Sequence, residues 1–492
     1  MSLDDSPIVW AICTILVVAF VYKLILDHTR DVPLEYLELQ SVVDSTRENN
    51  ELAIYKSTKL DYSSGLRVGL GIRYDHYKLR NGNLCDVWEI MLRCLRSDDQ
   101  RVIRVGKNTA KVSHLNFQVD KLAQFLHHVD EVYVVSLKFI ASAPVLAITI
   151  ACFVSNTTLH VYGDGLLEPK GMVVEEEHGE FYLSIGTKKT LVTSIVGEVH
   201  EKTTFENVYT PEKDKGIALR VTSPINARVS ATTNFTQTNL VSAAASCVKH
   251  LPPNLELGEK DRVAIIQSVI SSENISSSVV KMLTAFISQA ELSLSWIDQS
   301  TDEIMLWNPT IVCGSVDFIQ SLVSPPLGVE KLLYYHRLFA LSRLKFSLFT
   351  TFKKYPALRL VFAHRSLKSR PYTNWNTVRA SLCVQVVEEL GYFNVAGPMI
   401  VSDVYDYRQF PESVTRQISA CGTVVQANEA KLVNYNGVDP GDLCIRGYNI
   451  GKATTTMANV GEKVIRPDSN GFYTFPVEAR WGTDGCLYIM LT

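Results

Sequence analysis

The chain has 492 residues, which is too many for one small core and predicts about three folding units. With 46% apolar and 20% charged residues, its composition is that of a globular protein and argues against disordered, collagen-like or disulfide-stapled architectures. The formal net charge of -3 gives no general attraction to nucleic acid, so we expect no nucleic-acid partner.

The N-terminal run 7–26 (PIVWAICTILVVAFVYKLIL) is apolar except for Thr14 and Lys23. Its length is close to the roughly 20 residues that cross a bilayer as a helix. A cleaved signal peptide would carry a basic N-terminal flank, whereas Asp4 and Asp5 precede this run. We therefore predict a retained transmembrane anchor over residues 7–26; the alternative is a helix buried in the core.

Charges beside this run predict its orientation. Lys23, His28 and Arg30 lie at its C-terminal end, and the positive-inside rule places the rest of the chain in the cytosol. The ten cysteines are scattered singly, without a zinc-type spacing, and we expect reduced, buried thiols and no metal site. Three N-x-S/T sequons argue weakly for the lumen instead, at Asn156, Asn234 and Asn274.

A second apolar stretch, 139–154, is shorter, contains Pro144 and follows the strand-like residues 131–137. We predict a buried helix after a core strand, and therefore one transmembrane span in all.

Strand-like and helical patterns alternate through most of the chain, which is typical of α/β sheets with covered faces. Strand-like runs include 159–163, 181–186 and 263–269, and helical runs include 239–251 and 277–289. From residue 421 onward the chain consists of short strand-like runs separated by Gly, Asn, Asp and Pro, which predicts a small β-rich unit.

Short motifs in the C-terminal half resemble those of one enzyme superfamily. Residues 470–481 (NGFYTFPVEARW) and 484–489 (DGCLYI) are similar to D-G-W-F-R-T-G-D-x-G-x-W and D-G-x-L-x-I of the adenylate-forming, or AMP-binding, superfamily. Residues 440–447 (PGDLCIRG) resemble its P-G-E-L-x-x-R-G, and residues 390–398 (LGYFNVAGP) resemble its Y-G-x-T-E-T-x-G-P. Further similarities lie at Pro309-Thr310, Asn239-Leu240, Gly258 and Asp261-Arg262.

Order and spacing of these motifs agree with the superfamily from about residue 85 onward, and the resemblance is closest to the long-chain fatty acyl-CoA synthetases. It implies an α/β fold: a large N-terminal domain of two α/β subdomains with a small β-rich subdomain, behind one transmembrane helix. The expected boundaries are 1–31 for the anchor and its flanks, 32–410 for the AMP-binding-like subdomains and 411–492 for the β-rich subdomain.

The superfamily's phosphate loop, T-S-G-[ST]-T-G-x-P-K-G, uses glycines so that backbone amides approach the phosphates of ATP, and a lysine to offset their charge. The matching residues 222–231 (TSPINARVSA) lack every glycine and the lysine, with Pro224, Ala227 and Ser230 among the replaced positions. Pro224 also removes an N–H donor and fixes φ. We expect that this segment holds no triphosphate.

Two further positions of the superfamily are replaced. The glutamate that holds Mg²⁺ corresponds to Asn394, whose neutral amide is a poor ligand for this ion. The aspartate that binds the ribose hydroxyls corresponds to Val477, which accepts no hydrogen bond. The superfamily also continues into a mobile C-terminal domain that carries a catalytic lysine, and we expect this chain to lack that domain. The resemblance thus predicts no cofactor and no catalytic residue.

The segment 334–354 mixes Arg337, Arg343, Lys345 and other basic residues with aromatic ones. One possibility is a helix on an anionic membrane surface. The alternative, which we favour, is a helix packed on the sheet with basic side chains that extend to water.

These features predict a catalytically inactive acyl-CoA-synthetase-like protein on the cytosolic face of the endoplasmic reticulum or of lipid droplets. It would be a scaffold or a regulatory subunit with a protein partner in lipid metabolism. Two alternatives stay open: a sensor that binds a fatty acid or acyl-CoA, and a diverged acyl-CoA ligase completed by a partner.

Overall fold

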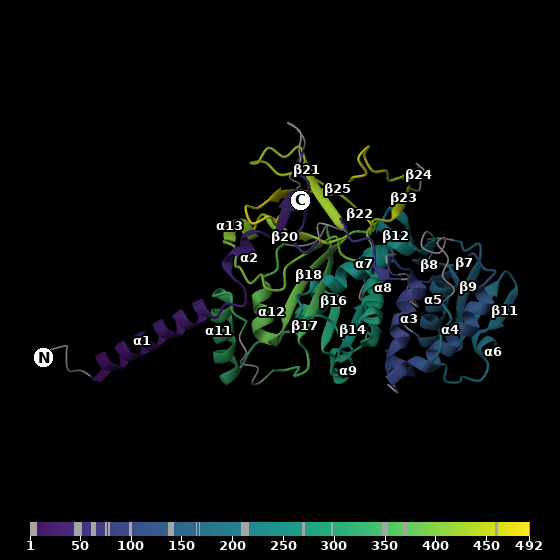
Figure 1. Cartoon of the computed structure of the whole chain (residues 1–492), viewed down its shortest axis with the longest axis horizontal. Helices are drawn as coiled ribbons and strands as arrows, with labels where there is room; N and C mark the ends of the chain where they lie inside the picture. The colour runs from purple at the N-terminus through teal and green to yellow at the C-terminus, as the bar shows by residue number, and fades with distance from the viewer. Residues whose placement is uncertain are drawn as a thin grey trace.

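A computed structural model of the chain describes residues 7–43, 52–60, 65–73, 76, 79–97, 101–135, 142–163, 165–166, 168–207, 216–267, 271–296, 299–346, 353–367, 371–457 and 461–491. Figure 1 shows a body of sheets and helices from which one long helix, α1, projects on the left-hand side.

Helix α1 (Pro7–His28) is the one described helix that is long and apolar enough to cross a membrane, with a mean hydropathy of 2.5 in its most apolar window. Nearly all of its side chains are exposed, and Leu26 is its buried residue. A core helix would bury its apolar side chains, so the structure speaks against the alternative of a buried helix and agrees with a candidate membrane span over residues 7–26. The insertion of α1 into a membrane is part of the proposed function.

The centre of the body is a mostly parallel sheet in the order β6-β5-β15-β14-β16-β17-β18. Its strands are β5 (Val102–Val105), β6 (Asn108–Lys111), β14 (Arg262–Gln267), β15 (Glu291–Trp296), β16 (Ile311–Ser315), β17 (Leu360–Ser366) and β18 (Gln385–Gly391). Helix α8 (Ser272–Ile287) packs on one face, and α10 (Val316–Ser321) and α12 (Trp375–Leu382) pack on the other. Both faces of this sheet are covered, and most side chains of β14 to β18 are buried.

A second sheet has the order β11-β10-β9-β7-β8-β12-β13-β23-β24. Its strands are β7 (Glu131–Val135), β8 (Thr158–Tyr162), β9 (Met172–Glu177), β10 (Glu180–Ile185), β11 (Lys188–Leu191), β12 (Ile217–Asn226), β13 (Val229–Thr236), β23 (Lys452–Met457) and β24 (Gly461–Val464). The accompanying helices are α3 (Leu84–Leu92), α4 (Val112–Leu126), α5 (Ala143–Ser155), α6 (Val192–Val196) and α7 (Gln237–His250). Helix α5 is buried and follows β7, as the sequence predicts for 139–154 as far as the described residues extend.

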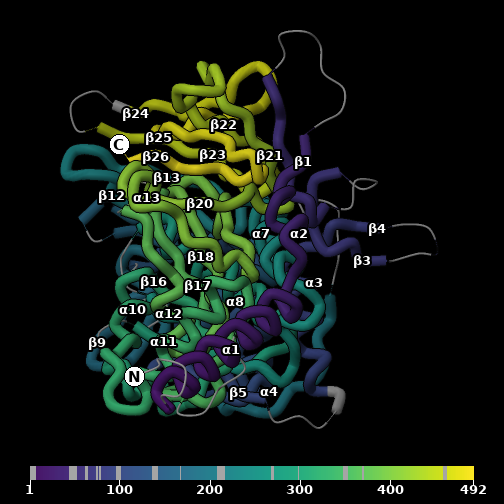
Figure 2. Tube along the Cα trace, turned by 90° about the vertical axis from the view of Figure 1, so that its left-hand side faces the viewer, coloured from purple at the N-terminus to yellow at the C-terminus, as the bar shows by residue number. Residues whose placement is uncertain are grey.

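The C-terminal strands continue the first sheet through β19 (Ile400–Val401) in antiparallel pairs. They are β20 (Ile418–Val424), β21 (Asn428–Val433), β22 (Gly441–Gly447), β25 (Tyr473–Trp481) and β26 (Leu487–Met490). Two strands from near the N-terminus, β1 (Ser41–Val43) and β2 (Tyr55–Ser57), extend this edge beside β21, as Figure 2 shows. The β-rich character expected after residue 421 is thus present.

The remaining described elements are short or peripheral. They are α2 (Leu34–Glu38), the two-stranded pair β3 (Ile72–Arg73) and β4 (Leu79–Arg80), a 3-10 helix at 93–97, α9 (Thr301–Leu306), α11 (Val329–Ser342) and α13 (Glu412–Thr415).

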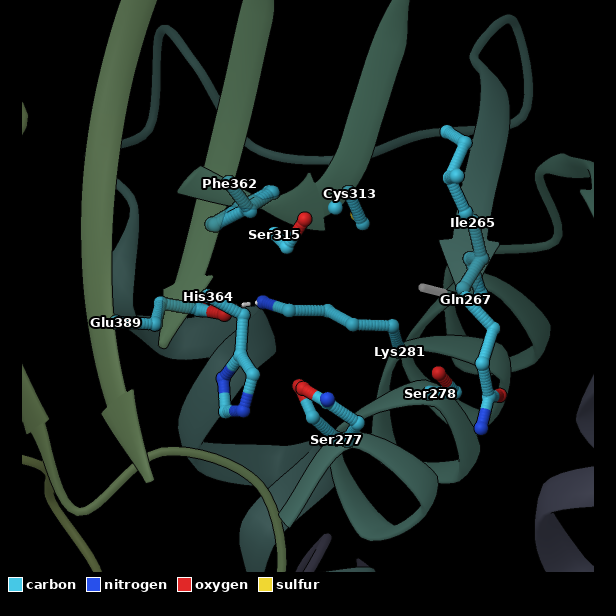
Figure 3. Close-up of a pocket in the computed structure, with 13 residues that line it drawn as sticks. Ile265, Gln267, Ser277, Ser278, Lys281, Cys313, Ser315, Phe362, His364 and Glu389 are labelled. Atoms are coloured by element: carbon cyan, nitrogen blue, oxygen red, sulfur yellow. Dashed lines mark hydrogen bonds and ion pairs between the residues drawn. The ribbon is translucent and has the colours of Figure 1, made fainter. Parts of the chain in front are cut away.

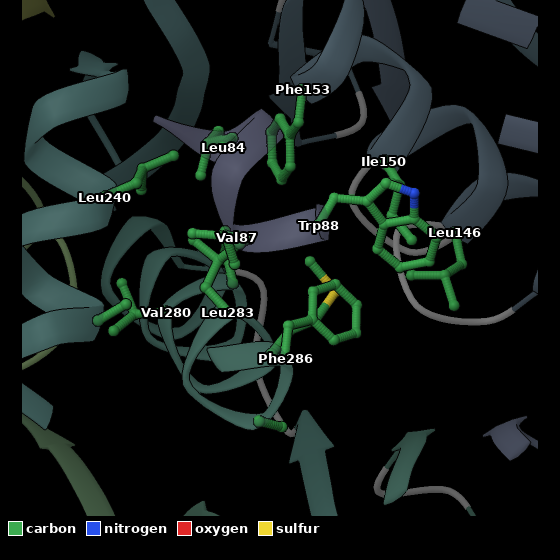
Figure 4. Packing of buried hydrophobic residues seen from close by; sticks show 14 of the residues in the cluster. Leu84, Val87, Trp88, Leu146, Ile150, Phe153, Leu240, Val280, Leu283 and Phe286 are labelled. Atoms are coloured by element: carbon green, nitrogen blue, oxygen red, sulfur yellow. The ribbon is translucent and has the colours of Figure 1, made fainter. Parts of the chain in front are cut away.

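The largest core cluster fills the space between the two sheets, where α3, α5, α7 and α8 meet (Figure 4). Trp88 of α3 is 1% exposed and lies edge-on to Phe286 of α8, with 5.4 Å between the ring centroids. Its indole N–H donates to Asn116 Oδ1 at 3.2 Å, so the polar tip is satisfied in the core.

Replacing Trp88 by alanine removes this contact and leaves a cavity, so we expect a loss of about 3–5 kcal/mol of stability. Chemical denaturation of the detergent-solubilised chain measures it. Leu306→Ala is the matched control, because Leu306 is 83% exposed and should leave the transition unchanged. Equal transition midpoints for the two variants would contradict this packing.

Candidate functional site

The segment that matches the phosphate loop is a tight hairpin. Strands β12 and β13 pair through Ser223↔Ala231, Pro224↔Ser230 and Asn226↔Val229, so that Ala227 and Arg228 alone form the turn. Asn226 Oδ1 accepts from the backbone N–H groups of Arg228 and Val229, at 2.9 and 3.0 Å. Because strand pairing continues to the turn, this segment offers no open loop of amides for a phosphate group.

Pro224 and Ala227 are exposed and Ser230 is half-buried. Strand β8 pairs with β12 as far as Thr222, so Pro224 lies beyond that pairing, where its missing N–H interrupts no ladder on that side.

Phe393 fills the space behind the hairpin. It forms an apolar cluster with Ala231 and Ala453, against which Ile225 and Tyr392 pack; we call this group the Phe393 cluster. The Phe393 carbonyl accepts hydrogen bonds from two hydroxyl groups, Thr233 Oγ1 at 3.1 Å and Ser272 Oγ at 2.7 Å. Phe393 thus places its ring behind the hairpin, and its carbonyl links β13 to the start of α8.

The structure does not bring the three predicted positions into one open cleft. Asn394 follows Phe393 and is 2% exposed, and its side-chain oxygen has no hydrogen-bond partner among the described residues. Val477 lies on the buried side of β25, in a separate core cluster with Phe475 and Ala479. Neither position supplies a carboxylate, and no group of three metal-binding side chains occurs in the described ranges. These residues do not fit magnesium–ATP.

A small cavity lies at the carboxyl ends of the parallel strands, where open α/β sheets bind their ligands (Figure 3). Its volume is about 20 Å³, enough for a single water molecule. Strands β14, β16, β17 and β18 and helix α8 enclose it. Its polar lining includes Gln267, Ser277, Lys281, His364 and Glu389.

Lys281 and Glu389 occupy the centre of this site as a buried ion pair. Their side chains are 4% and 2% exposed, and the lysine Nζ donates to Glu389 Oε1. The same Nζ lies 3.6 Å from the centre of the Phe362 ring. Burial raises the pKa of Glu389, and the charge on Lys281 opposes that rise. For Lys281, burial lowers the pKa of the ammonium group, but its acidic neighbours outweigh this effect and hold the pKa above its ordinary value.

The other polar groups of the cavity are neutral. Burial, followed by the charge on Lys281, lowers the pKa of His364 to about 3. Burial raises the pKa of Cys313, which lines the cavity, to about 12. Burial likewise raises the pKa of Cys247, whose sulfur lies 3.9 Å from Lys281 Nζ outside the lining, to about 11, so neither is a thiolate at neutral pH. Both ring nitrogens of His364 and both amide atoms of Gln267 have no hydrogen-bond partner among the described residues. Ordered water explains these orphan groups best.

The sequence interpretation missed this cluster, although it contains a signal. Lys281 is the one charged residue in the helical run 277–289, and Glu388 and Glu389 interrupt an apolar strand. Glu388 faces the opposite side of β18 and pairs with Arg365 at 2.8 Å. A charge inside an apolar element requires a partner, and this requirement could have pointed to the pairs.

Removing one partner of the central pair leaves the other charge buried, so Lys281→Met should destabilise the chain by about 3–5 kcal/mol. The double variant Lys281→Met/Glu389→Leu should recover most of that loss, because it removes both charges. Denaturation midpoints measure both variants. Arg416→Met, which breaks an exposed ion pair with Glu412, is the control and should change little. Additive losses in the double variant would contradict a coupled pair.

Buried His364 predicts a dependence of stability on pH. In the folded state it binds a proton only near pH 3, whereas unfolded histidine binds one near 6.5. Between these values the unfolded state therefore binds more protons than the folded state. As the pH falls through this window, the free energy of unfolding decreases by about 1.4 kcal/mol for each pH unit. His364→Gln should reduce the slope of unfolding free energy against pH over this range. Parallel slopes for the variant and the parent chain would refute the assignment.

Comparisons with known proteins agree with this geometry at the level of the fold. No protein-family model matches the sequence. A putative uncharacterized protein of Saccharomyces cerevisiae, YHR045W, is 24% identical to the chain, and the match covers 95% of both proteins.

Two solved structures resemble the whole body. The unliganded o-succinylbenzoate coenzyme A synthetase MenE from Bacillus subtilis has a TM-score of 0.53 at 12% identity, over 82% of this chain and 78% of MenE. NpsA–ThdA from Klebsiella oxytoca, a fused adenylation–PCP di-domain, has a TM-score of 0.53 at 12% identity, over 84% of this chain and 72% of that one. At these identities the likeness concerns architecture alone. The chain therefore has the fold of the adenylate-forming enzymes, the superfamily that its motifs resemble.

Proposed function

We propose that this protein is a membrane-anchored member of the adenylate-forming fold that does not form adenylates, and that it is a scaffold or regulatory subunit for enzymes of lipid metabolism. The closed β12–β13 hairpin, backed by the Phe393 cluster, carries the proposal. Adenylate formation requires groups that hold and neutralise a triphosphate, and this part of the fold offers paired strands and an aromatic ring instead.

The cavity at the carboxyl ends of the strands supports the same conclusion. Its volume of about 20 Å³ is far below the roughly 300–1,000 Å³ of ordinary ligand sites. The Lys281–Glu389 pair occupies the space instead of a substrate. The acyl-sensor alternative gains no support at this position.

The anchored part of the proposal places α1 in the membrane and the body in the cytosol. The basic flank of α1 supports this side, and the three sequons lie in folded elements or at the end of one. Asn156 caps α5, Asn234 lies in β13 and accepts from Arg220 at 2.7 Å, and Asn274 lies in the first turn of α8. Asn234 and Asn274 are thus held within secondary structure, whereas Asn156 is exposed at the end of α5, so the sequons give no argument for the lumen at two of their three positions. The endoplasmic reticulum or lipid droplets are the membranes that we propose.

The direct test is an assay of the full chain in detergent, with ATP, Mg²⁺, coenzyme A and fatty acids of several lengths. We expect no fatty-acid-dependent release of pyrophosphate, because nothing in the hairpin neutralises the phosphates. An active acyl-CoA synthetase under the same conditions is the positive control.

Two further readouts separate the alternatives. Calorimetric titration with magnesium–ATP should give no binding heat, and saturable binding would revive the ligase completed by a partner. Extraction of the purified chain should yield no stoichiometric fatty acid or acyl-CoA, and its presence would favour the sensor. Pyrophosphate release that depends on a fatty acid would sink the proposal as a whole.

A further inference from the structure

Helix α11 exposes an apolar face. Leu332, Tyr335 and Phe339 follow one another at helical spacing and point outward, and the preceding Leu327 and Val329 continue the same surface; we call these five residues the α11 face. Leu332 is 72% and Tyr335 is 56% exposed even with α1 in place. Contiguous exposed apolar surface of this kind marks a contact with a partner or with lipid.

The opposite side of α11 is fixed to the body. Arg337, Ala340 and Leu341 are buried, and the Arg337 guanidinium donates to the Ala380 carbonyl of α12 at 3.1 Å. The helix that we favoured for 334–354 is present as far as Ser342, where α11 ends, and it packs on α12; residues 347–352 lie outside the described residues. Arg337 points into the body instead of extending to water. The α11 face is thus held rigidly at the surface.

Helix α1 leaves the body beside this face (Figures 1 and 2). The Tyr22 hydroxyl bonds to His336, and the Tyr22 ring lies 5.5 Å from the His336 ring and 6.3 Å from the Phe339 ring, measured between centroids. Beyond the apolar run, Asp27 pairs with Arg343, whose Nε lies 2.8 Å from Asp27 Oδ1. These contacts fix the end of α1 against α11.

The position of Tyr22 along α1 sets the depth of α11. Tyr22 lies four residues before the end of the run 7–26, which corresponds to about 6 Å along a helix. If that run spans the hydrocarbon core, His336 and Phe339 lie at the boundary between headgroups and acyl chains, where interfacial helices insert by about 5–10 Å. Burial, followed by Arg337, lowers the pKa of His336, so this ring is neutral at that boundary.

The charges around α11 argue against an electrostatic contact. Arg343 is paired with Asp27, and Lys345 is paired with Asp31 at 2.9 Å. With Arg337 buried under the helix, the basic residues that the sequence offers for anionic lipid are largely committed to the protein. Lys331 is an exposed charged residue of α11 and lies next to Leu332 in the chain. The five side chains of the α11 face are apolar, which favours the acyl region of a lipid, and a lysine beside them can extend to the headgroups.

We propose that the α11 face inserts into the cytosolic leaflet of the membrane that α1 spans, so that the body contacts lipid at a second point. This proposal rests on the anchor in the proposed function and is independent of the missing chemistry. It assigns the apolar face to lipid and not to a second copy of the chain or to another protein.

The test is photocrosslinking of the full chain in its native membrane, with a benzophenone amino acid in place of Leu332 and, separately, of Tyr335. We expect phospholipid adducts at both positions, unchanged by high salt because the contact is apolar. The matched control is Val438, which is 73% exposed in the loop between β21 and β22 and should give no lipid adduct. A crosslinked dimer of the chain, an adduct with another protein, or no lipid adduct at Leu332 and Tyr335 would overturn the proposal.

Alkaline carbonate extraction of the same membranes separates this proposal from the anchor. A chain that stays in the membrane without lipid adducts on α11 would refute the second contact alone. A chain released by carbonate would refute the anchor, and the insertion of α11 with it.

Discussion

The burial of one lysine constrains the centre of this molecule. Helix α8 packs so closely over the carboxyl ends of the parallel strands that Lys281 has no route to water, and an unpaired ammonium there would be too costly to keep. Glu389 on β18 satisfies it, and Phe362 adds its ring face. Once this pair is in place, the region where such sheets ordinarily receive a ligand is occupied by the protein itself. The surrounding Gln267 and His364 are then left with space for little more than water.

The β12–β13 hairpin and the Lys281–Glu389 pair concern the side chains of the site, whereas the likeness to known enzymes concerns the fold. The architecture resembles that of MenE, whereas the segment that we align with the phosphate loop is a paired hairpin and Phe393 packs in an apolar cluster. Fold and function are separable in this way because a sheet is stabilised by its core, while a site depends on a few side chains that the core does not need. Side chains of a site can therefore differ between proteins that share one fold.

The sequence predicted the features that depend on local pattern. The apolar run of α1, the buried helix α5 after β7 and the C-terminal strands follow from periodicity and turn residues alone. Strands β23 (KATTTM) and β24 (GEKV) were missed because their residues are mostly polar. Strand β23 also pairs with β13, which lies more than 200 residues earlier in the chain. The Lys281–Glu389 pair was missed for the same reason, since its members lie 108 residues apart. Pro224, Asn394 and Val477 were singled out through motif resemblance alone, and their correspondence to functional positions stays a prediction, as does the division at residues 31 and 410.

If α1 is inserted in a membrane, as we propose, its contacts with α11 affect how the body meets other proteins there. Asp27 pairs with Arg343, and Asp31 pairs with Lys345. These ion pairs tie the C-terminal end of α1 to the body and restrict the rotation of the body relative to α1. A protein confined to the same bilayer would then meet the same side of the body at each collision. Restricting a search to two dimensions and one orientation raises the effective concentration of that side, so a weak surface would be enough for association.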